Sequence, residues 1–262
     1  MSAWVVAGQP GGPPLVALHT WTKERDQYDR LGAALGDRAV YSSLPPSPLD
    51  GPPPRRVDQW VDHHERVLRA MPVEAPFRIV GWSFGGVLAV ELARRLRANG
   101  EGVEWVGLID SIRPRLKPLS ARDYMWVHLG ESLHITDERA RVAYLWLHTK
   151  VLLHRSITGV APWLMPRSAR RASPPKPTDP LTVAIHTAYL NYRGDDVPFP
   201  VSLYVTDESV ARTDQSALRW AGHLAAGFEL VEIPGTHETV FDDAHVTALA
   251  AALRRSLDLT TR

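Results

Sequence analysis

The sequence contains no cysteine among its 262 residues. That absence excludes disulfides, thiolate metal sites, iron–sulfur clusters and a cysteine nucleophile, so covalent catalysis would use Ser, Thr, Lys or a carboxylate. Histidine pairs with metal-ligand spacing, such as H-E-x-x-H, are also missing, so we expect no metal and no other cofactor. The sequence therefore restricts the candidate chemistry to side chains of the protein itself.

Long apolar runs are missing too. None reaches the roughly 18 residues that a membrane-spanning helix needs, so we expect no membrane partner. Residues 1–14 are rich in glycine and proline and lack the basic start and apolar core of a signal peptide, which favours a cytoplasmic protein. The chain also has almost no net charge, because 30 Lys and Arg are balanced by 29 Asp and Glu. This balance gives no reason to expect a nucleic-acid partner.

Hydrophobic residues make up 44% of the chain, enough for a substantial core. Short apolar runs predict strands at residues 15–18, 39–44, 77–81, 105–109, 201–205 and 228–233. Apolar residues at helical spacing predict helices at residues 28–35, 57–71, 87–96, around 216–224 and at 244–257. This alternation favours an α/β fold with a mostly parallel central sheet and helices on both faces.

One segment breaks the alternation. Residues 113–200 contain no convincing strand, and helical patterns occur around 121–129, 138–153 and 181–192. We interpret the segment as a helical lid inserted into a single domain of residues 1–262. Its residues 113–176 hold 12 Lys and Arg against four Asp and Glu, which fits either docking of an acidic partner or solvated helix faces.

Residues 81–85, Gly-Trp-Ser-Phe-Gly, match the G-x-S-x-G pattern between a predicted strand and a predicted helix. A serine nucleophile on such a strained turn needs small neighbours two residues away, which Gly81 and Gly85 provide. The N–H of Phe84 at the helix start would stabilise an oxyanion. We therefore predict Ser83 as a nucleophile, with an inert serine in a glycine-rich turn as the plainer alternative.

A serine nucleophile needs a base and an orienting acid. His237 follows the strand 228–233, and it is the candidate base because the base of an α/β-hydrolase occupies this loop. Asp110 and Asp207 each follow a predicted strand, and a carboxylate from either position could hold the imidazole. His19 follows the first predicted strand and fits either a structural role or a place at the site, the structural role being favoured.

These motifs resemble the thioesterase domains that release products from non-ribosomal peptide synthetases and modular polyketide synthases. The resemblance covers residues 15–257 and rests on Gly-Trp-Ser-Phe-Gly-Gly-Val-Leu-Ala-Val-Glu-Leu-Ala (81–93), Leu-Ile-Asp-Ser (108–111) and Val-Glu-Ile-Pro-Gly-Thr-His (231–237). It implies an α/β-hydrolase fold and favours Asp110 over the alternative Asp207. An aromatic residue before the serine, here Trp82, is typical of the releasing domains.

One departure from the family pattern follows the first strand. The family usually has His-Pro-(Ala/Gly)-Gly-Gly there, whose backbone supplies an oxyanion donor, whereas residues 19–24 read His-Thr-Trp-Thr-Lys-Glu. Every non-proline residue has a backbone N–H, so Trp21 is the candidate for the second oxyanion donor beside Phe84. Trp82 and His19 are the candidate substrate-binding residues. A bulky indole at Trp21 would reshape the mouth of the site.

The resemblance implies a serine thioesterase that releases an acyl, polyketide or peptidyl chain from a phosphopantetheinyl carrier protein. Release would pass through an acyl-Ser83 intermediate and end in hydrolysis or cyclisation. Two alternatives remain open: a carboxylesterase-type hydrolase of small esters, and a non-catalytic module that binds acyl groups or a carrier. The sequence does not predict the oligomeric state.

Overall fold

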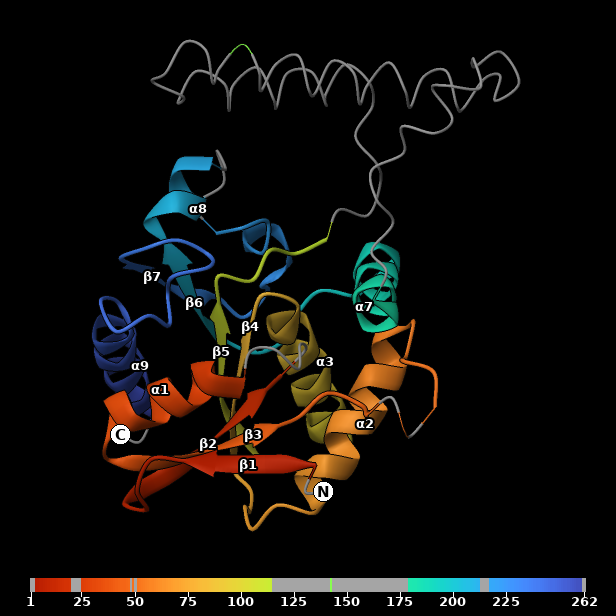
Figure 1. Ribbon diagram of the computed structural model, residues 1–262, viewed down its shortest axis with the longest axis horizontal. Helices are drawn as coiled ribbons and strands as arrows, with labels where there is room; N and C mark the ends of the chain where they lie inside the picture. The colour runs from red at the N-terminus through yellow and green to blue at the C-terminus, as the bar shows by residue number, and fades with distance from the viewer. Residues whose placement is uncertain are drawn as a thin grey trace. The chain divides into compact units, whose positions relative to one another are not determined.

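A computed structural model describes residues 3–19, 25–47, 49, 51–114, 142, 179–212 and 217–260 (Figure 1). The chain divides into two compact units, and the first consists of Met1–Pro114, Asp179–Val210 and Asp214–Arg262. The second consists of Arg115–Thr178 with Ala211–Thr213 and falls almost entirely outside the described residues. The predicted helices at 121–129 and 138–153 lie in that undescribed part.

The first unit is built on a seven-stranded sheet in the order β1-β3-β2-β4-β5-β6-β7. The strands are β1 (Trp4–Ala7), β2 (Gly12–Leu18), β3 (Arg38–Ser43), β4 (Phe77–Trp82), β5 (Val103–Ile109), β6 (Val201–Thr206) and β7 (Phe228–Ile233). All neighbours pair in parallel except β1 and β3, which are antiparallel. The carboxyl ends of β4, β5, β6 and β7 therefore lie along one edge of the sheet, where open α/β sheets form their sites.

Helices cover both faces of this sheet (Figure 1). They are α1 (Arg25–Leu35), α2 (Val57–Arg69), α3 (Phe84–Ala98), α7 (Pro180–Asn191), α8 (Asp207–Arg212) and α9 (Val246–Thr260). Alternate strand residues point to opposite faces, so two apolar clusters form. The first packs α2, α3 and α7 on the sheet, and the second packs α1 and α9 on the other face.

The structure confirms the predicted mixed α/β fold, and each predicted strand is present with bounds that differ by no more than three residues from those expected. Strand β1 was not predicted, because its flanks are rich in glycine and proline and its four residues are too few for a clear period. The helix expected around residues 216–224 is wrong. Among the described residues of that segment, only a short 3₁₀ turn, Ala221–His223, is helical.

Tertiary contacts explain why the chain turns there. Leu218 and Arg219 have φ values of 47° and 68°, which no right-handed helix accommodates. The Leu218 carbonyl accepts a hydrogen bond from the Arg113 N–H at 3.1 Å. The indole Nε1 of the buried Trp220 donates to the Ser111 carbonyl at 2.7 Å. The apolar spacing that predicted a helix instead fits this turn against the loop after β5.

Candidate active site

Ser83 lies at the turn between strand β4 and helix α3. Its backbone has φ 54° and ψ −122°, an uncommon conformation for a residue with a side chain. The Ser83 N–H donates to the Ile109 carbonyl at 3.0 Å, and the Ser83 carbonyl accepts from the Gly86 N–H at 3.1 Å. These bonds fix the turn to the end of β5 and to the first turn of α3. Ser83 is half-buried between two fully buried neighbours.

Two glycines let α3 approach the sheet at backbone distance. A Cβ on Gly81 would lie 2.0 Å from the Gly85 carbonyl oxygen, and a Cβ on Gly86 would lie 2.4 Å from the Ser111 side chain. Neither distance is possible between real atoms. The small residues beside the serine were expected for this steric reason, and the geometry at Gly81 agrees with it.

We expect Gly81→Ala to destabilise the fold by about 3 kcal/mol, because the new methyl group would collide with backbone rather than with a movable side chain. Gly222→Ala is the matched control, since a Cβ there would meet no atom within 4 Å. The control should change the free energy of unfolding by less than about 0.5 kcal/mol. Urea denaturation measures both, and equal midpoints for the two variants would contradict the crowding at Gly81.

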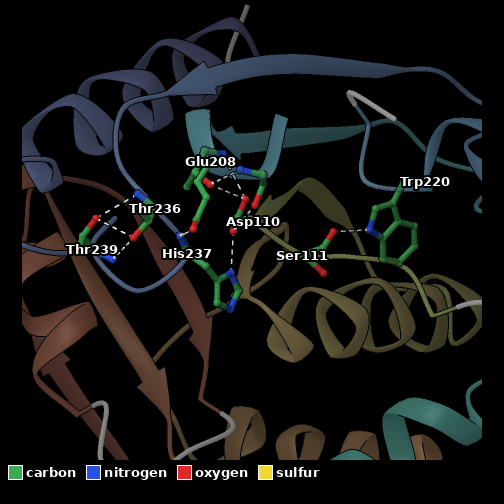
Figure 2. A network of polar contacts seen from close by, with 9 residues as sticks. Asp110, Ser111, Glu208, Trp220, Thr236, His237 and Thr239 are labelled. Atoms are coloured by element: carbon green, nitrogen blue, oxygen red, sulfur yellow. Dashed lines mark hydrogen bonds and ion pairs between the residues drawn. The ribbon is translucent and has the colours of Figure 1, made fainter. Parts of the chain in front are cut away.

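Asp110 follows β5 directly and is fully buried, with φ 42° (Figure 2). Its Oδ1 accepts hydrogen bonds from the N–H and the hydroxyl of Thr206, both at 3.1 Å. Its Oδ2 accepts from the Ser209 hydroxyl at 2.9 Å and lies 2.6 Å from Nδ1 of His237. A carboxylate in this position fixes the imidazole tautomer with the proton on Nδ1, which leaves Nε2 free to accept one.

The surroundings of Asp110 favour its ionised form. Burial opposes ionisation, but the hydrogen bonds from His237, Thr206 and Ser209 outweigh it and hold the pKa of the Asp110 carboxyl below its ordinary value of 3.8. The carboxylate is therefore charged at neutral pH and able to stabilise an imidazolium on His237.

We expect Ser209→Ala to lower the free energy of unfolding by about 1.5–3 kcal/mol at pH 7, because a buried carboxylate loses a hydrogen bond. Since folding lowers the pKa of Asp110, this contribution is present above about pH 4 and disappears as the pH falls through the folded-state pKa. Ser256→Ala, whose hydroxyl donates to the Ala252 carbonyl at 3.4 Å and makes no hydrogen bond to Asp110 in the described part of the chain, is the control. Denaturation curves at pH 7 and pH 3 measure the free energy of unfolding of both variants. A loss in Ser209→Ala that is equal at the two pH values would contradict its dependence on the ionised Asp110.

His237 lies in the loop after β7, and its position is fixed from both sides. Thr236 and Thr239 exchange hydrogen bonds, N–H to hydroxyl, at 3.0 and 3.2 Å (Figure 2). The backbone N–H of His237 donates to the Glu208 carboxylate at 3.4 Å. The His237 side chain is 30% exposed, so its free face is accessible to solvent.

The imidazole of His237 stacks on the indole of Trp82, with ring centroids 4.7 Å apart and planes inclined by 25°. Trp82 immediately precedes Ser83, so the stack holds the histidine beside the serine turn. No hydrogen bond joins Ser83 to His237 among the described residues. In free enzymes this bond is often long and forms only when substrate binds.

The other candidate residues fall in different places. Asp207 is exposed at the start of α8 and makes no contact with His237 in the described part of the chain. Phe84 is the first residue of α3, so its N–H has no partner within the helix. Its ring is anchored edge-on against Trp60 and Tyr189. Trp21 lies outside the described residues, as does the whole of residues 20–24.

His19 and Trp82, expected to line the substrate, are only 2% and 5% exposed. The ring of His19 packs edge-on against Tyr28 at 4.6 Å. The hydroxyl of Tyr28 donates to the Leu18 carbonyl at 3.4 Å and accepts from the Trp82 N–H at 3.0 Å. Tyr28 therefore connects the ends of β2 and β4 directly below the serine turn, a role that its position in a helical pattern did not signal.

In the part of the chain that the structure describes, no group of three or more His, Asp or Glu is arranged to hold a metal ion. None of the described helices combines the length and the apolar character that crossing a bilayer requires.

Part of the chain also matches a known protein family. The family described as "Thioesterase domain" matches residues 13–124, which run from β2 past β5 and include Ser83 and Asp110. This part of the chain is similar to thioesterase domains. The likeness to solved structures shows the α/β-hydrolase fold that the sequence predicted.

Relatives of this chain include much longer synthases. Orsellinic acid synthase ArmB of Armillaria ostoyae is 28% identical over 244 residues, which are 92% of this chain and 10% of that protein. Atromentin synthetase invA2 of Paxillus involutus is 22% identical over 228 residues, 77% of this chain and 22% of that protein. The chain thus spans a tenth to about a fifth of the length of these relatives.

Among solved structures, the NocB thioesterase domain in covalent complex with a fluorophosphonate nocardicin G analogue superposes with a TM-score of 0.63. The two are 22% identical, and the match covers 97% of this chain and 99% of that one. This likeness shows that the chain shares the fold of the NocB thioesterase domain over nearly its whole length.

Proposed function

We propose that this protein is a thioesterase that releases an acyl, polyketide or peptidyl chain from a phosphopantetheinyl carrier protein, with Ser83, His237 and Asp110 as its catalytic residues. The contact that supports this proposal most directly is the 2.6 Å bond between His237 Nδ1 and the buried Asp110 carboxylate. It links two residues 127 positions apart at the edge of the sheet where Ser83 precedes α3.

The first half of the proposed reaction transfers the acyl group to the protein. His237 Nε2 takes the proton of the Ser83 hydroxyl while Ser83 Oγ attacks the thioester carbonyl carbon. Asp110 stabilises the imidazolium that results. The Phe84 N–H at the start of α3 donates to the oxyanion, and such a donor contributes about 3 kcal/mol in known enzymes. The C–S bond then breaks, the thiol leaves with the proton from His237, and an ester to Ser83 remains.

The second half frees the chain from Ser83. A nucleophile gives its proton to His237 and attacks the ester carbonyl, and the Ser83 oxygen leaves with that proton. With water as nucleophile the product is a free acid, and with an amine or hydroxyl of the bound chain it is a ring. The same three side chains serve both outcomes, because the site determines only that the nucleophile is deprotonated by His237.

A carrier protein as partner is supported by the relatives. The similar proteins include a synthase of orsellinic acid and a synthetase of atromentin, both several times longer than this chain. The excess of Lys and Arg in residues 113–176, which lie almost wholly outside the described part of the chain, would suit an acidic docking partner.

The proposal is tested by intact-mass measurement after offering the full chain a panel of acyl-phosphopantetheine and acyl-N-acetylcysteamine thioesters. We expect a mass increase of one acyl group on Ser83, absent in Ser83→Ala. Matched p-nitrophenyl esters are offered in parallel. Faster turnover of the esters than of the thioesters would favour a carboxylesterase instead, and no adduct with any acyl donor would contradict an acyl-serine mechanism.

A further inference from the structure

The buried ring of Trp82 has an unusual set of neighbours for a residue expected to bind substrate. One face stacks on His237, with centroids 4.7 Å apart, and Phe241 meets the ring at 5.9 Å and 89°. Phe241 in turn packs edge-on against Tyr28, whose hydroxyl accepts the Trp82 backbone N–H. The indole is thus fixed by other aromatic rings and by the backbone, and it is only 5% exposed.

The polar atom of the indole takes no part in this arrangement. Trp82 Nε1 is buried and has no hydrogen-bond partner among the described residues. A buried indole N–H usually has a hydrogen-bond partner, so this group does not explain why a tryptophan occupies the position. The contact that distinguishes this position is between the flat face of the indole and the imidazole of His237.

That face has a function in the proposed reaction. When Ser83 loses its proton, His237 becomes an imidazolium, and the negative face of an indole attracts a cation within about 6 Å of its centroid. The attraction is strongest where water is excluded, and the indole face lies in a buried cluster. Among the described residues, His237 also contacts the charged groups of Asp110 at Nδ1 and Glu208 at the backbone N–H.

We propose that Trp82 is a positioning residue that holds His237 beside Ser83 and stabilises, through its ring face, the imidazolium formed in acyl transfer. This inference rests on the proposed function, because it requires His237 to accept the proton of Ser83. It replaces the expectation that Trp82 contacts substrate.

The test is the rate at which a fluorophosphonate labels Ser83 in the full chain, measured from pH 5 to pH 9. The variants are Trp82→Leu and Trp82→Phe, together with a tetrafluorinated tryptophan introduced at position 82, which keeps the ring's shape but weakens its negative face. Because the wild-type ring stabilises the protonated base, losing that stabilisation makes the unprotonated base appear at lower pH. We expect the acid limb of the rate profile to move about half a pH unit lower in Trp82→Leu and in the fluorinated protein.

We expect the plateau labelling rate to fall about three- to tenfold in Trp82→Leu. Trp82→Phe should keep most of the wild-type plateau rate, and its acid limb should lie close to the wild-type position. The same fluorinated residue at Trp105 is the matched control, since Trp105 is buried in the same apolar cluster without touching His237. That control should leave the acid limb in place. The fluorinated protein decides the question even if Trp82→Leu does not fold.

Two failures are distinguishable. If wild-type Ser83 is labelled but the acid limb stays within about 0.1 unit in the fluorinated protein, the stabilising role of Trp82 is wrong and the proposed function stands. If wild-type Ser83 is not labelled at any pH, the proposed nucleophile is wrong, and this inference falls with it.

Discussion

Replacing Ser83 with alanine lowers thioester turnover by about a million-fold, to a residual rate that oxyanion stabilisation and binding alone can supply. The alanine has no oxygen to carry the acyl group, and in a serine hydrolase the loss of the nucleophile costs about as much as the loss of the whole triad. The substitution breaks no hydrogen bond of the Ser83 side chain among the described residues, so the loss of rate reports on the missing hydroxyl. Steady-state hydrolysis of an acyl-N-acetylcysteamine thioester measures the effect.

The fold should survive this substitution. The turn is held by backbone bonds from Ser83 to Ile109 and Gly86, which alanine retains. A near-ultraviolet circular dichroism spectrum and a urea midpoint close to wild type are therefore the controls. If the well-folded variant kept more than about a thousandth of the wild-type rate, another nucleophile would be at work and the assignment of Ser83 would be wrong.

The second large effect separates the two candidate acids. We expect Asp110→Asn to lower kcat by about ten-thousandfold, because an amide in that place no longer enforces the imidazole tautomer or balances the imidazolium. Asp207→Asn, at an exposed position beyond the end of β6, should stay within about twofold of wild type. Both variants are assayed with the same thioester at pH 7.

The pair of variants is informative in either direction. A large loss in Asp207→Asn with an active Asp110→Asn would reverse the assignment of the acid. The surroundings argue against that result: Thr206 and Ser209, on either side of Asp207 and Glu208, direct their hydroxyls to the Asp110 carboxylate. The segment after β6, where the alternative acid would stand, thus supplies donors to the acid after β5.

Much of this arrangement could be predicted from the sequence. Ser83 lies between a buried strand and a helix, and the small residues around it have a single steric explanation, so the turn follows from local pattern alone. The order of strands and helices also follows, because short apolar runs mark the buried strands and apolar residues at helical spacing mark the helices. The choice between Asp110 and Asp207 did not follow from physics, since both stand at strand ends, and only the family resemblance favoured one.

The rest depended on contacts between distant residues. The turn at Leu218 and Arg219 is stabilised by bonds to the loop after β5, which local apolar spacing cannot reveal. The same holds for Tyr28, whose hydroxyl bonds to the ends of both β2 and β4. Its partner on β4, the Trp82 N–H, is 54 residues away in the sequence. Ser209 and Thr206 looked like ordinary polar residues, because their partner Asp110 is nearly a hundred positions away.

The 127-residue separation of Asp110 and His237 also has a consequence for folding. Loop-closure entropy must be overcome before so distant a pair gains any stabilisation, whereas the β4–α3–β5 unit around Ser83 forms through contacts between neighbouring elements. We therefore expect a refolding chain to complete its serine turn earlier than its acid–base pair. In such a chain, recovered secondary structure would precede recovered reactivity of Ser83, because a native-like turn without His237 holds an alcohol that nothing deprotonates.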